Sequence, residues 1–338
     1  NLTSLVFDAD SQLATIDYHA FYDCDNLTSI EFPNTLTIID DYAFYSCDKL
    51  EEISFGENTQ IATINSYAFA YCSSLTEIAI PSSVTSISGN AFSNCSKLET
   101  ITVANENTVY DSRNESNAIV ATETNTLILG CKNTVIPNTV TAIGDYAFYN
   151  CDAITAMEIP NSVTSIGNQV FYDCDNLTSV DIPSSVTSLG SQAFYSCDKL
   201  ESITFAENSE LESIDNSAFA NCSLLLNVIL PSSITSIGEN VFNNCSKLYG
   251  IRCLAEEVPT TAINAFNTIP YHTNIQVPEQ SVEMYKATLP WSNYNITKIY
   301  SSMPGEYATV DYGNYSLKFS IIGFEPAECD VVCNIKPT

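Results

Sequence analysis

Hydrophobic residues recur along this chain in units of three short pieces, and residues 177–197 contain one such unit. The first piece, Leu-Thr-Ser-Val-Asp-Ile-Pro, alternates apolar and polar residues and ends at a proline, which cannot donate to a strand ladder, so it predicts a short strand. The second, Val-Thr-Ser-Leu-Gly, is rich in β-branched residues and ends at a glycine that can turn. The third, Ala-Phe-Tyr-Ser-Cys, is too short for a regular helix, so we expect one helical or 3₁₀ turn with Phe and Cys pointing inward.

The unit repeats at a fixed period, which is typical of stacked supersecondary units with a continuous core. Four cysteines recur 150 residues later, and within each quartet the steps are 23, 25 and 23 residues. Residues 44–51 recur unchanged as 194–201, which indicates that the array grew by copying a block. Copying preserves a core and leaves surfaces free to diverge, so functional residues are expected where the copies differ. The cysteines are Cys24, Cys47, Cys72 and Cys95, then Cys174, Cys197, Cys222 and Cys245.

The pattern predicts a repeat solenoid that is mainly β, with short helical or 3₁₀ turns and an irregular C-terminal cap. We expect the solenoid over residues 1–250, a capping segment over 251–300 and a small, truncated β extension over 301–338. The sequence is expected to begin partway through a repeat. Pro278 opens a segment of helical spacing that Trp291 follows, as suits a cap.

The repeat is interrupted once, between Phe92 and Phe148. These residues are 56 positions apart, which exceeds two periods by ten residues. Residues of about 104–135 contain turn-forming sequences on both sides of apolar runs. They predict an inserted hairpin. The alternative is a protruding binding loop, since long loops on repeat arrays often lie on the recognition face.

The stretch over residues 182–200, I-P-S-S-V-T-S-L-G-x-x-A-F-x-x-C-x-x-L, resembles the BspA-like leucine-rich-repeat family, and the likeness covers most of the chain. The resemblance implies a right-handed leucine-rich-repeat superhelix in a bacterial protein that is secreted or attached to the cell surface. Some members are described as adhesins for host matrix or plasma proteins. It implies no catalytic residues. It also implies a cysteine near Ser116 as a partner for Cys131, and this chain has none there.

The formal net charge of −29 restricts the classes of molecule that the chain can bind. It repels phosphate backbones and anionic lipid and favours basic or cation-bearing molecules. Nucleic acid is therefore excluded as a ligand class. No apolar stretch approaches the roughly 18 residues of a transmembrane helix.

Thirteen cysteines would ordinarily predict a disulfide framework, but nine of them follow a phenylalanine by three residues and should form one column. Equivalent side chains on successive coils are parallel, whereas a disulfide needs the two Cβ atoms turned toward each other. The column therefore predicts buried free thiols. Disulfides are restricted to the remaining cysteines, which are Cys131, Cys253, Cys329 and Cys333.

Side chains for catalysis are lacking, because two histidines in no recognised motif give no nucleophile, base or zinc arrangement. We therefore expect no enzyme and no cofactor. Carboxylates beside the cysteines, at Asp173 and Asp175 and again at Asp198, form a column that could bind Ca²⁺. The alternative is a solvated acidic edge.

Strand positions between the core residues should lie on the concave face, which is small, polar and acidic and becomes apolar toward its C-terminal end. The apolar end either packs against the cap or is an exposed interaction site. The candidate residues are Glu31, Glu52, Glu77, Glu99, Asp181 and Glu201, followed by Leu226, Asn227, Ile229, Tyr249 and Arg252.

A row of tyrosines next to the buried phenylalanines is a second candidate, either for protein or glycan contacts or as a cover for the edge of the coil. The row is Tyr22, Tyr45, Tyr149, Tyr172 and Tyr195.

The leading hypothesis is a non-enzymatic, extracellular or surface-attached protein that binds a host or neighbouring macromolecule, and adhesion through the concave strand face is its expected role. A lipid anchor upstream of the sequence is consistent with this location. The alternatives are a glycan-binding surface lipoprotein and a passive spacer.

Overall fold

The computed structural model describes residues 2–8, 10–56, 58–299, 307–312 and 315–320. Its contacts divide the chain into two units, Asn1–Thr297 and Lys298–Thr338. The described part of the second unit contains an antiparallel hairpin of β25 (Tyr307–Tyr312) and β26 (Tyr315–Ser320), within the β extension expected over residues 301–338. Cys329 and Cys333 lie outside the described residues.

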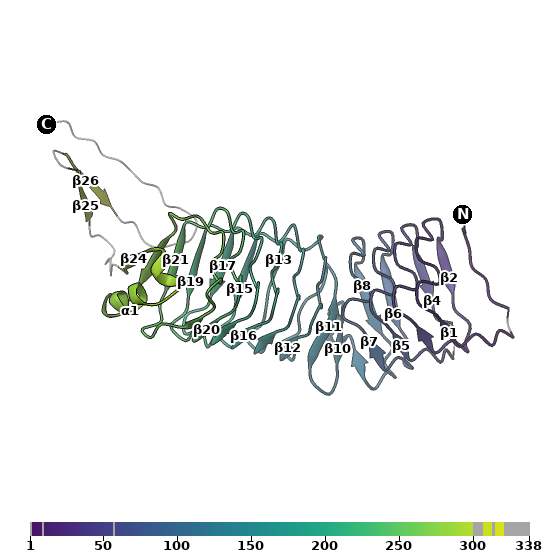
Figure 1. The fold of residues 1–338 in the computed structure, drawn as a ribbon. Coiled ribbons are helices and arrows are strands. Elements are labelled where there is room, and N and C mark those ends of the chain that lie inside the picture. The colour runs from purple at the N-terminus through teal and green to yellow at the C-terminus, as the bar shows by residue number, and fades with distance from the viewer. Residues whose placement is uncertain (1, 9, 57, 300–306, 313–314, 321–338) are drawn as a thin grey trace. The chain divides into compact units, whose positions relative to one another are not determined.

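The first unit is a three-sided solenoid, and its first side is made of the Leu-x-x-Ile-x-Ile pieces (Figure 1). In β15 (Ser179–Ile182), Val180 and Ile182 are buried while Ser179 and Asp181 are exposed, as the alternation predicts. These strands form a pair β2-β4, a pair β6-β8, and a seven-stranded sheet. The others are β2 (Ser29–Glu31), β4 (Glu52–Ser54), β6 (Glu77–Ile80), β8 (Thr100–Val103), β13 (Ala156–Met157), β17 (Ser202–Phe205), β19 (Asn227–Leu230), β21 (Gly250–Cys253), β23 (Asn274–Val277) and β24 (Asn295–Lys298).

The second side consists of two-residue strands, one per coil, that pair in parallel with their neighbours. Threonines beside these strands donate to the coil before them, as Thr187 does to the Thr164 carbonyl at 3.2 Å. The strands are β1 (Thr15–Ile16), β3 (Ile38–Ile39), β5 (Thr63–Ile64) and β7 (Ser86–Ile87), then β12 (Ala142–Ile143), β14 (Ser165–Ile166), β16 (Ser188–Leu189), β18 (Ser213–Ile214), β20 (Ser236–Ile237) and β22 (Thr260–Thr261).

The third side differs from the helical or 3₁₀ turn that we expected. Gln192 and Ser196 have positive φ angles of 57° and 54°, which interrupt any helical run. The backbone N–H groups of Gln192, Phe194 and Ser196 instead donate to carbonyls of the next coil at 2.8–2.9 Å. The intervening Ala193 and Tyr195 close turns within their own coil. This side, called here the turn side, is therefore a ladder of turns.

Phenylalanine rings form the predicted column inside the solenoid. Phe171 is fully buried and stacks between Phe148 and Phe194, at centroid distances of 5.2 and 5.1 Å. The cysteines beside it are free thiols, as predicted, and nearly all are buried. Cys131 and Cys253, which the sequence left as candidates for disulfides, are free thiols too.

The insertion is a hairpin, as predicted, and its strands are built into the solenoid wall (Figure 1). It comprises β9 (Tyr110–Asp111), the 3₁₀ turn η1 (Arg113–Glu115), β10 (Ala118–Ala121) and β11 (Thr126–Gly130), and it joins the nine-stranded sheet that β12 continues. Ala118 and Val120 belong to the C-terminal core cluster, whereas Ile119 and Leu129 belong to the N-terminal one. The hairpin is therefore a partition between two cores, and its exposed residues are Asn114 and Glu115 in η1 and Glu123 and Thr124 in the turn between β10 and β11.

The C-terminal end of the phenylalanine column is covered by a short helical segment, as expected of a cap. It comprises η2 (Glu279–Ser281), α1 (Val282–Ala287) and η3 (Trp291–Asn293). Trp291 is fully buried, lies edge-on to Phe266 at 4.8 Å, and donates from Nε1 to the Thr261 hydroxyl at 3.0 Å. The cap thus closes the last coil of the column.

Candidate interaction surfaces

The exposed side of the first-side strands is the surface that the sequence singled out, and we call it the strand face. All six predicted acidic residues are exposed on it or beside it, and the register pairs Glu52 with Ser29 and Glu77 with Thr100. Glu99 forms an ion pair with Lys132 at 2.5 Å, which links the strand face to the hairpin insertion. The acidic residues are Glu31, Glu52, Glu77, Glu99, Asp181 and Glu201.

A hollow of about 400 Å³ lies on the strand face between β4 and β6, which belong to separate sheets. Glu52 and Glu77 line it together with small side chains such as Ser54 and Ala79. Apolar side chains such as Ile80 and Val103 complete the lining, and the two carboxylates suit a cationic group.

Toward the C-terminal end, the strand face becomes apolar. Leu226, Ile229 and Tyr249 are 37%, 43% and 52% exposed, so the interpretation that this end packs against the cap is wrong. The Asn227 side-chain amide donates to the Tyr249 hydroxyl at 2.6 Å, and Gly250 leaves the space that this contact needs, since a Cβ there would lie 2.5 Å from Asn227 Oδ1. We call Leu226, Asn227, Ile229, Tyr249 and Arg252 the C-terminal patch.

The copied block shows that the fold does not require the C-terminal patch. At the positions 150 residues earlier, Thr76, Ala79 and Glu99 occupy the places of Leu226, Ile229 and Tyr249. The adjacent core residues are unchanged in character, with Ile78 in place of Val228, and both are buried. The strand face therefore has the same scaffold in both blocks but different surface chemistry.

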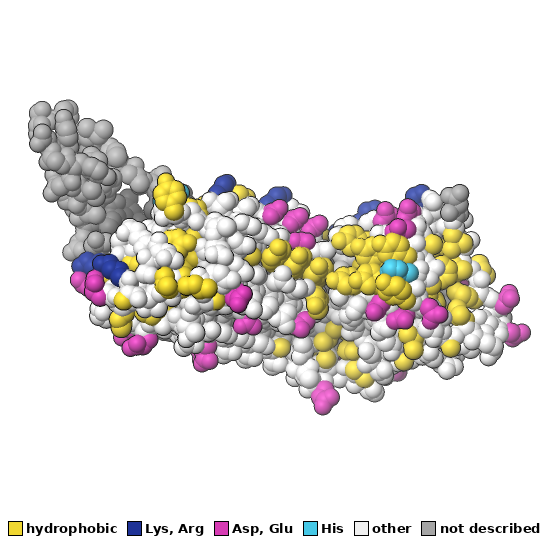
Figure 2. Space-filling model, in the orientation of Figure 1, with side chains coloured by type: hydrophobic (Ala, Val, Ile, Leu, Met, Phe, Trp, Pro, Cys, Tyr) yellow, Lys and Arg dark blue, Asp and Glu magenta, His cyan; other side chains and the backbone are white. Residues whose placement is uncertain are grey.

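Tyrosines gather on the turn side in a larger set than the sequence analysis proposed. The predicted row is present, with Tyr22 stacked on Tyr45 at 4.9 Å and Tyr172 on Tyr195 at 4.8 Å. The structure adds Tyr18, His19, Tyr42, Tyr67, Tyr71 and Tyr146. Four of these precede the column phenylalanine by two residues, a spacing that could have identified them, namely His19, Tyr42, Tyr67 and Tyr146. We call the eleven residues the tyrosine surface, and Figure 2 shows it as a broad yellow area with carboxylates at its border.

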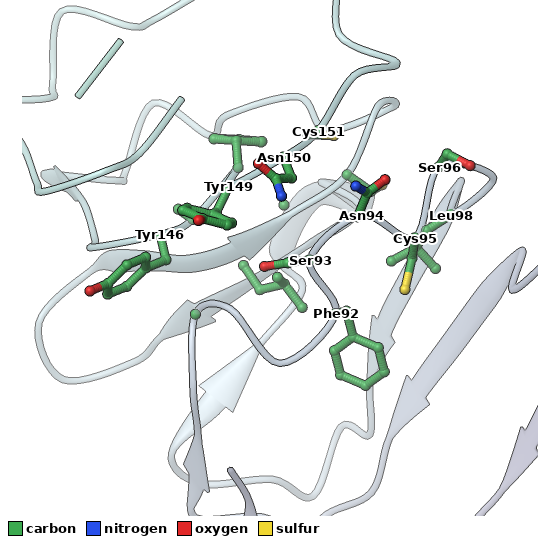
Figure 3. A pocket seen from close by; sticks show the side chains of 16 residues that line it. Phe92, Ser93, Asn94, Cys95, Ser96, Leu98, Tyr146, Tyr149, Asn150 and Cys151 are labelled. Atoms are coloured by element: carbon green, nitrogen blue, oxygen red, sulfur yellow. The ribbon is translucent and has the colours of Figure 1, made fainter. Parts of the chain in front are cut away.

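A pocket of about 20 Å³ lies where the two cores meet (Figure 3). Ser93 Oγ and Asn150 Oδ1, two of the buried polar atoms without a hydrogen-bond partner among the described residues, come from residues that line it. This volume accommodates about one water molecule. The pocket is therefore too small to bind a substrate.

The carboxylate column beside the thiols is partly buried. Burial raises the pKa of Asp152, Asp173 and Asp175, and neighbouring carboxylates raise those of Asp173 and Asp175 further. Within the described ranges, no group of three or more His, Cys, Asp or Glu side chains is arranged to hold a metal ion. Calcium binding by this column stays a prediction. Of the helices described, none is long and apolar enough to cross a membrane.

Comparison with known proteins agrees with this architecture. Six copies of the BspA type leucine rich repeat region match residues 1–116, 128–249 and 208–310. The chain is similar in structure to the pneumococcal vaccine antigen PcpA, with 21% identity, a TM-score of 0.64, and coverage of 88% of this chain and 74% of that one. A leucine-rich repeat protein from Eubacterium ventriosum shares 25% identity with a TM-score of 0.55, over 76% of this chain and 81% of that one. No curated protein matches the sequence. The chain belongs to the BspA-type leucine-rich-repeat family.

Proposed function

We propose that the chain is a non-enzymatic, secreted or surface-attached protein that binds another protein through its strand face, with the C-terminal patch at the centre of the contact. The observation that carries this proposal is the exposure of Leu226, Ile229 and Tyr249, which lie in or directly before the neighbouring strands β19 and β21. Exposed apolar and aromatic side chains that lie together mark contact sites, because their burial against a partner removes apolar surface from water.

The surroundings of the patch fit an interface of this kind. Asn227 and Arg252 supply hydrogen-bonding groups beside the apolar residues, which is the common division between an apolar centre and a polar rim. The remainder of the strand face is acidic. A partner with an apolar anchor surrounded by basic groups would therefore match both the apolar centre and the acidic surroundings of the patch.

The test is a binding screen of the purified chain against matrix and plasma proteins and, in parallel, against a glycan array. The decisive variant is Leu226→Thr/Ile229→Ala, which installs the residues of the first block without changing the net charge. Thr164→Ala, on the second side, is the matched control. We expect a protein ligand that binds the wild type and the control but not the double variant.

Three other outcomes contradict the proposal. Binding to glycans alone favours a glycan-binding surface lipoprotein. No binding in either screen favours a passive spacer. A protein ligand that binds the double variant as well as the wild type places the contact elsewhere.

A further inference from the structure

Four members of the tyrosine surface occupy backbone positions that disfavour them. Tyr42, Tyr67, Tyr71 and Tyr146 have φ angles of 58°, 55°, 62° and 64°. This left-handed region suits glycine and asparagine, and a bulky residue there is an outlier. Strained residues of this kind persist where the surrounding structure or a function requires them.

The second copy of the repeated block, which lies 150 residues after the first, shows that the fold does not need the aromatic rings. At the positions 150 residues later the backbone is again left-handed, but the side chains are polar. The coil-to-coil hydrogen bonding is the same, with Tyr42 N–H donating to the Ser66 carbonyl at 3.0 Å and Gln192 N–H to the Asn216 carbonyl at 2.9 Å. The residues that replace Tyr42, Tyr67 and Tyr71 are Gln192, Ser217 and Asn221, with φ angles of 57°, 57° and 65°.

The rings form one continuous surface although they come from distant parts of the sequence. Tyr42 stacks on Tyr67 at 5.0 Å, and Tyr67 lies edge-on to Tyr149 at 6.2 Å across the insertion. The Asn150 amide also donates to the Tyr71 hydroxyl at 3.3 Å. The contacts join rings of both blocks into the area that Figure 2 shows.

Carboxylates, and no lysine or arginine, accompany these rings. The turn segments that bear them, residues 17–24, 40–47, 65–72, 144–151, 167–174 and 190–197, contain no Lys or Arg. Burial raises the pKa of Tyr45 to about 12 and those of Tyr42 and Tyr172 in the same direction, so the phenols remain neutral hydrogen-bonding groups. The aspartates on these segments are Asp17, Asp23, Asp40, Asp41, Asp145 and Asp173.

The orientation of the rings decides between two classes of ligand. Tyr172 is half-buried and stacked between Tyr149 and Tyr195 at 4.9 and 4.8 Å, so the faces of the inner ring are covered and a ligand can reach it only at its edge and hydroxyl. A sugar ring stacks on an open aromatic face, which this run lacks at its centre. A guanidinium or ammonium group, by contrast, is attracted by aspartates, by phenol oxygens and by the faces of the terminal rings.

We propose that the tyrosine surface is a second docking surface, separate from the strand face, that binds a lysine- and arginine-rich segment of a partner protein. Its aspartates attract the basic segment, and its phenols and rings hold the cationic groups. The net charge of −29 favours the encounter.

The test compares the wild type with Tyr42→Gln/Tyr67→Ser/Tyr71→Asn, which copies the second block and leaves the net charge unchanged. The probe is a short fluorescent peptide of alternating arginine and glycine, and anisotropy is measured at physiological ionic strength. The proposal predicts binding by the wild type and at least about tenfold weaker binding by the triple variant, with an unchanged melting temperature. Because charge is conserved, non-specific attraction to an acidic protein cannot produce this difference.

Two further measurements complete the test. Peptide bound to the wild type should protect Tyr22 and Tyr42 from iodination, which is read by mass spectrometry without any variant. The reciprocal change, Gln192→Tyr/Ser217→Tyr/Asn221→Tyr, should strengthen peptide binding. Equal affinity of wild type and triple variant, no wild-type binding, or loss in the triple variant of binding to a glucan oligosaccharide but not to the peptide, would each overturn the proposal.

Discussion

The Cys197 thiol donates a hydrogen bond to the backbone carbonyl of Phe171, one coil earlier, at 3.0 Å. The same bond, from the column cysteine to the phenylalanine carbonyl of the preceding coil, occurs in seven coils at 3.0–3.4 Å. The cysteine column therefore does more than fill space, because each thiol satisfies a carbonyl on the inner side of the turn ladder.

Cys197→Ala removes this donor and leaves a small void, so we expect the free energy of unfolding to fall by about 1–3 kcal/mol. Urea unfolding monitored by circular dichroism measures the change. Cys24→Ala is the matched control, since that thiol is only partly buried and should lose less. Equal losses at the two positions would show that the hydrogen bond contributes nothing.

Alkaline pH should destabilise the chain steeply. Burial raises the pKa of Cys151 and Cys245 to about 12, and it raises those of Cys174, Cys197 and Cys222 well above the usual value. From about pH 8.5 upward the unfolded chain loses thiol protons that the folded chain retains, so stability falls by about 1.4 kcal/mol per pH unit for each such thiol. Urea midpoints from about pH 7 to about pH 10.5, under reducing conditions, measure the slope. A flat profile contradicts the assignment of buried, protonated thiols, and Cys245→Ala should make the profile shallower.

Phe171→Ala should cost about 3–5 kcal/mol, because the ring is fully buried between two others and its removal interrupts the column. In a repeat array this loss also weakens the coupling between neighbouring coils. Thermal melting measures the effect, with the half-buried Phe205→Ala as the matched substitution. An unchanged midpoint for Phe171→Ala would rule out the buried column.

Ser116→Ala should leave stability unchanged or raise it, by up to about 3 kcal/mol. Ser116 is fully buried, and its hydroxyl has no partner among the residues described. Thr134→Val is the opposite case, because that hydroxyl donates to the Asn117 carbonyl at 2.6 Å and accepts from Cys131 N–H at 2.8 Å. Equal destabilisation by the two changes would contradict the assignment of the Ser116 hydroxyl as a buried group without a partner among the described residues.

The sequence predicted the coil, the phenylalanine and cysteine columns and the exposed acids because a fixed period shows directly which residues share a phase. It predicted the hairpin because turn-forming residues flank apolar runs where the period is interrupted. It did not predict the left-handed residues at Gln192 and Ser196, since neither is glycine, and their conformation follows from hydrogen bonding to the next coil. The two-core arrangement was missed for a related reason. Successive residues of β10 face different cores, and a strand buried on both sides lacks the alternation that reveals one face.

The candidate site was predicted less well, because surface residues are positioned by partners far away in the chain. The exposure of Leu226 and Ile229 depends on where the cap lies, which periodicity does not specify. The contact of Tyr67 with Tyr149 depends on how the insertion brings the two blocks together. Differences between the two copies of the block identify the candidate surface residues better than periodicity does, since residues that the scaffold needs are the same in character in both copies.

The most direct test of the proposed strand-face interaction is the affinity of the Leu226→Thr/Ile229→Ala variant for the protein ligand found in the screen, measured by calorimetry beside the wild type. Two centrally placed apolar contacts of more than about 1 kcal/mol each correspond to a loss of at least about tenfold. We predict that loss together with an unchanged melting temperature. Equal affinity of the two proteins would contradict the assignment of the C-terminal patch as the centre of the contact.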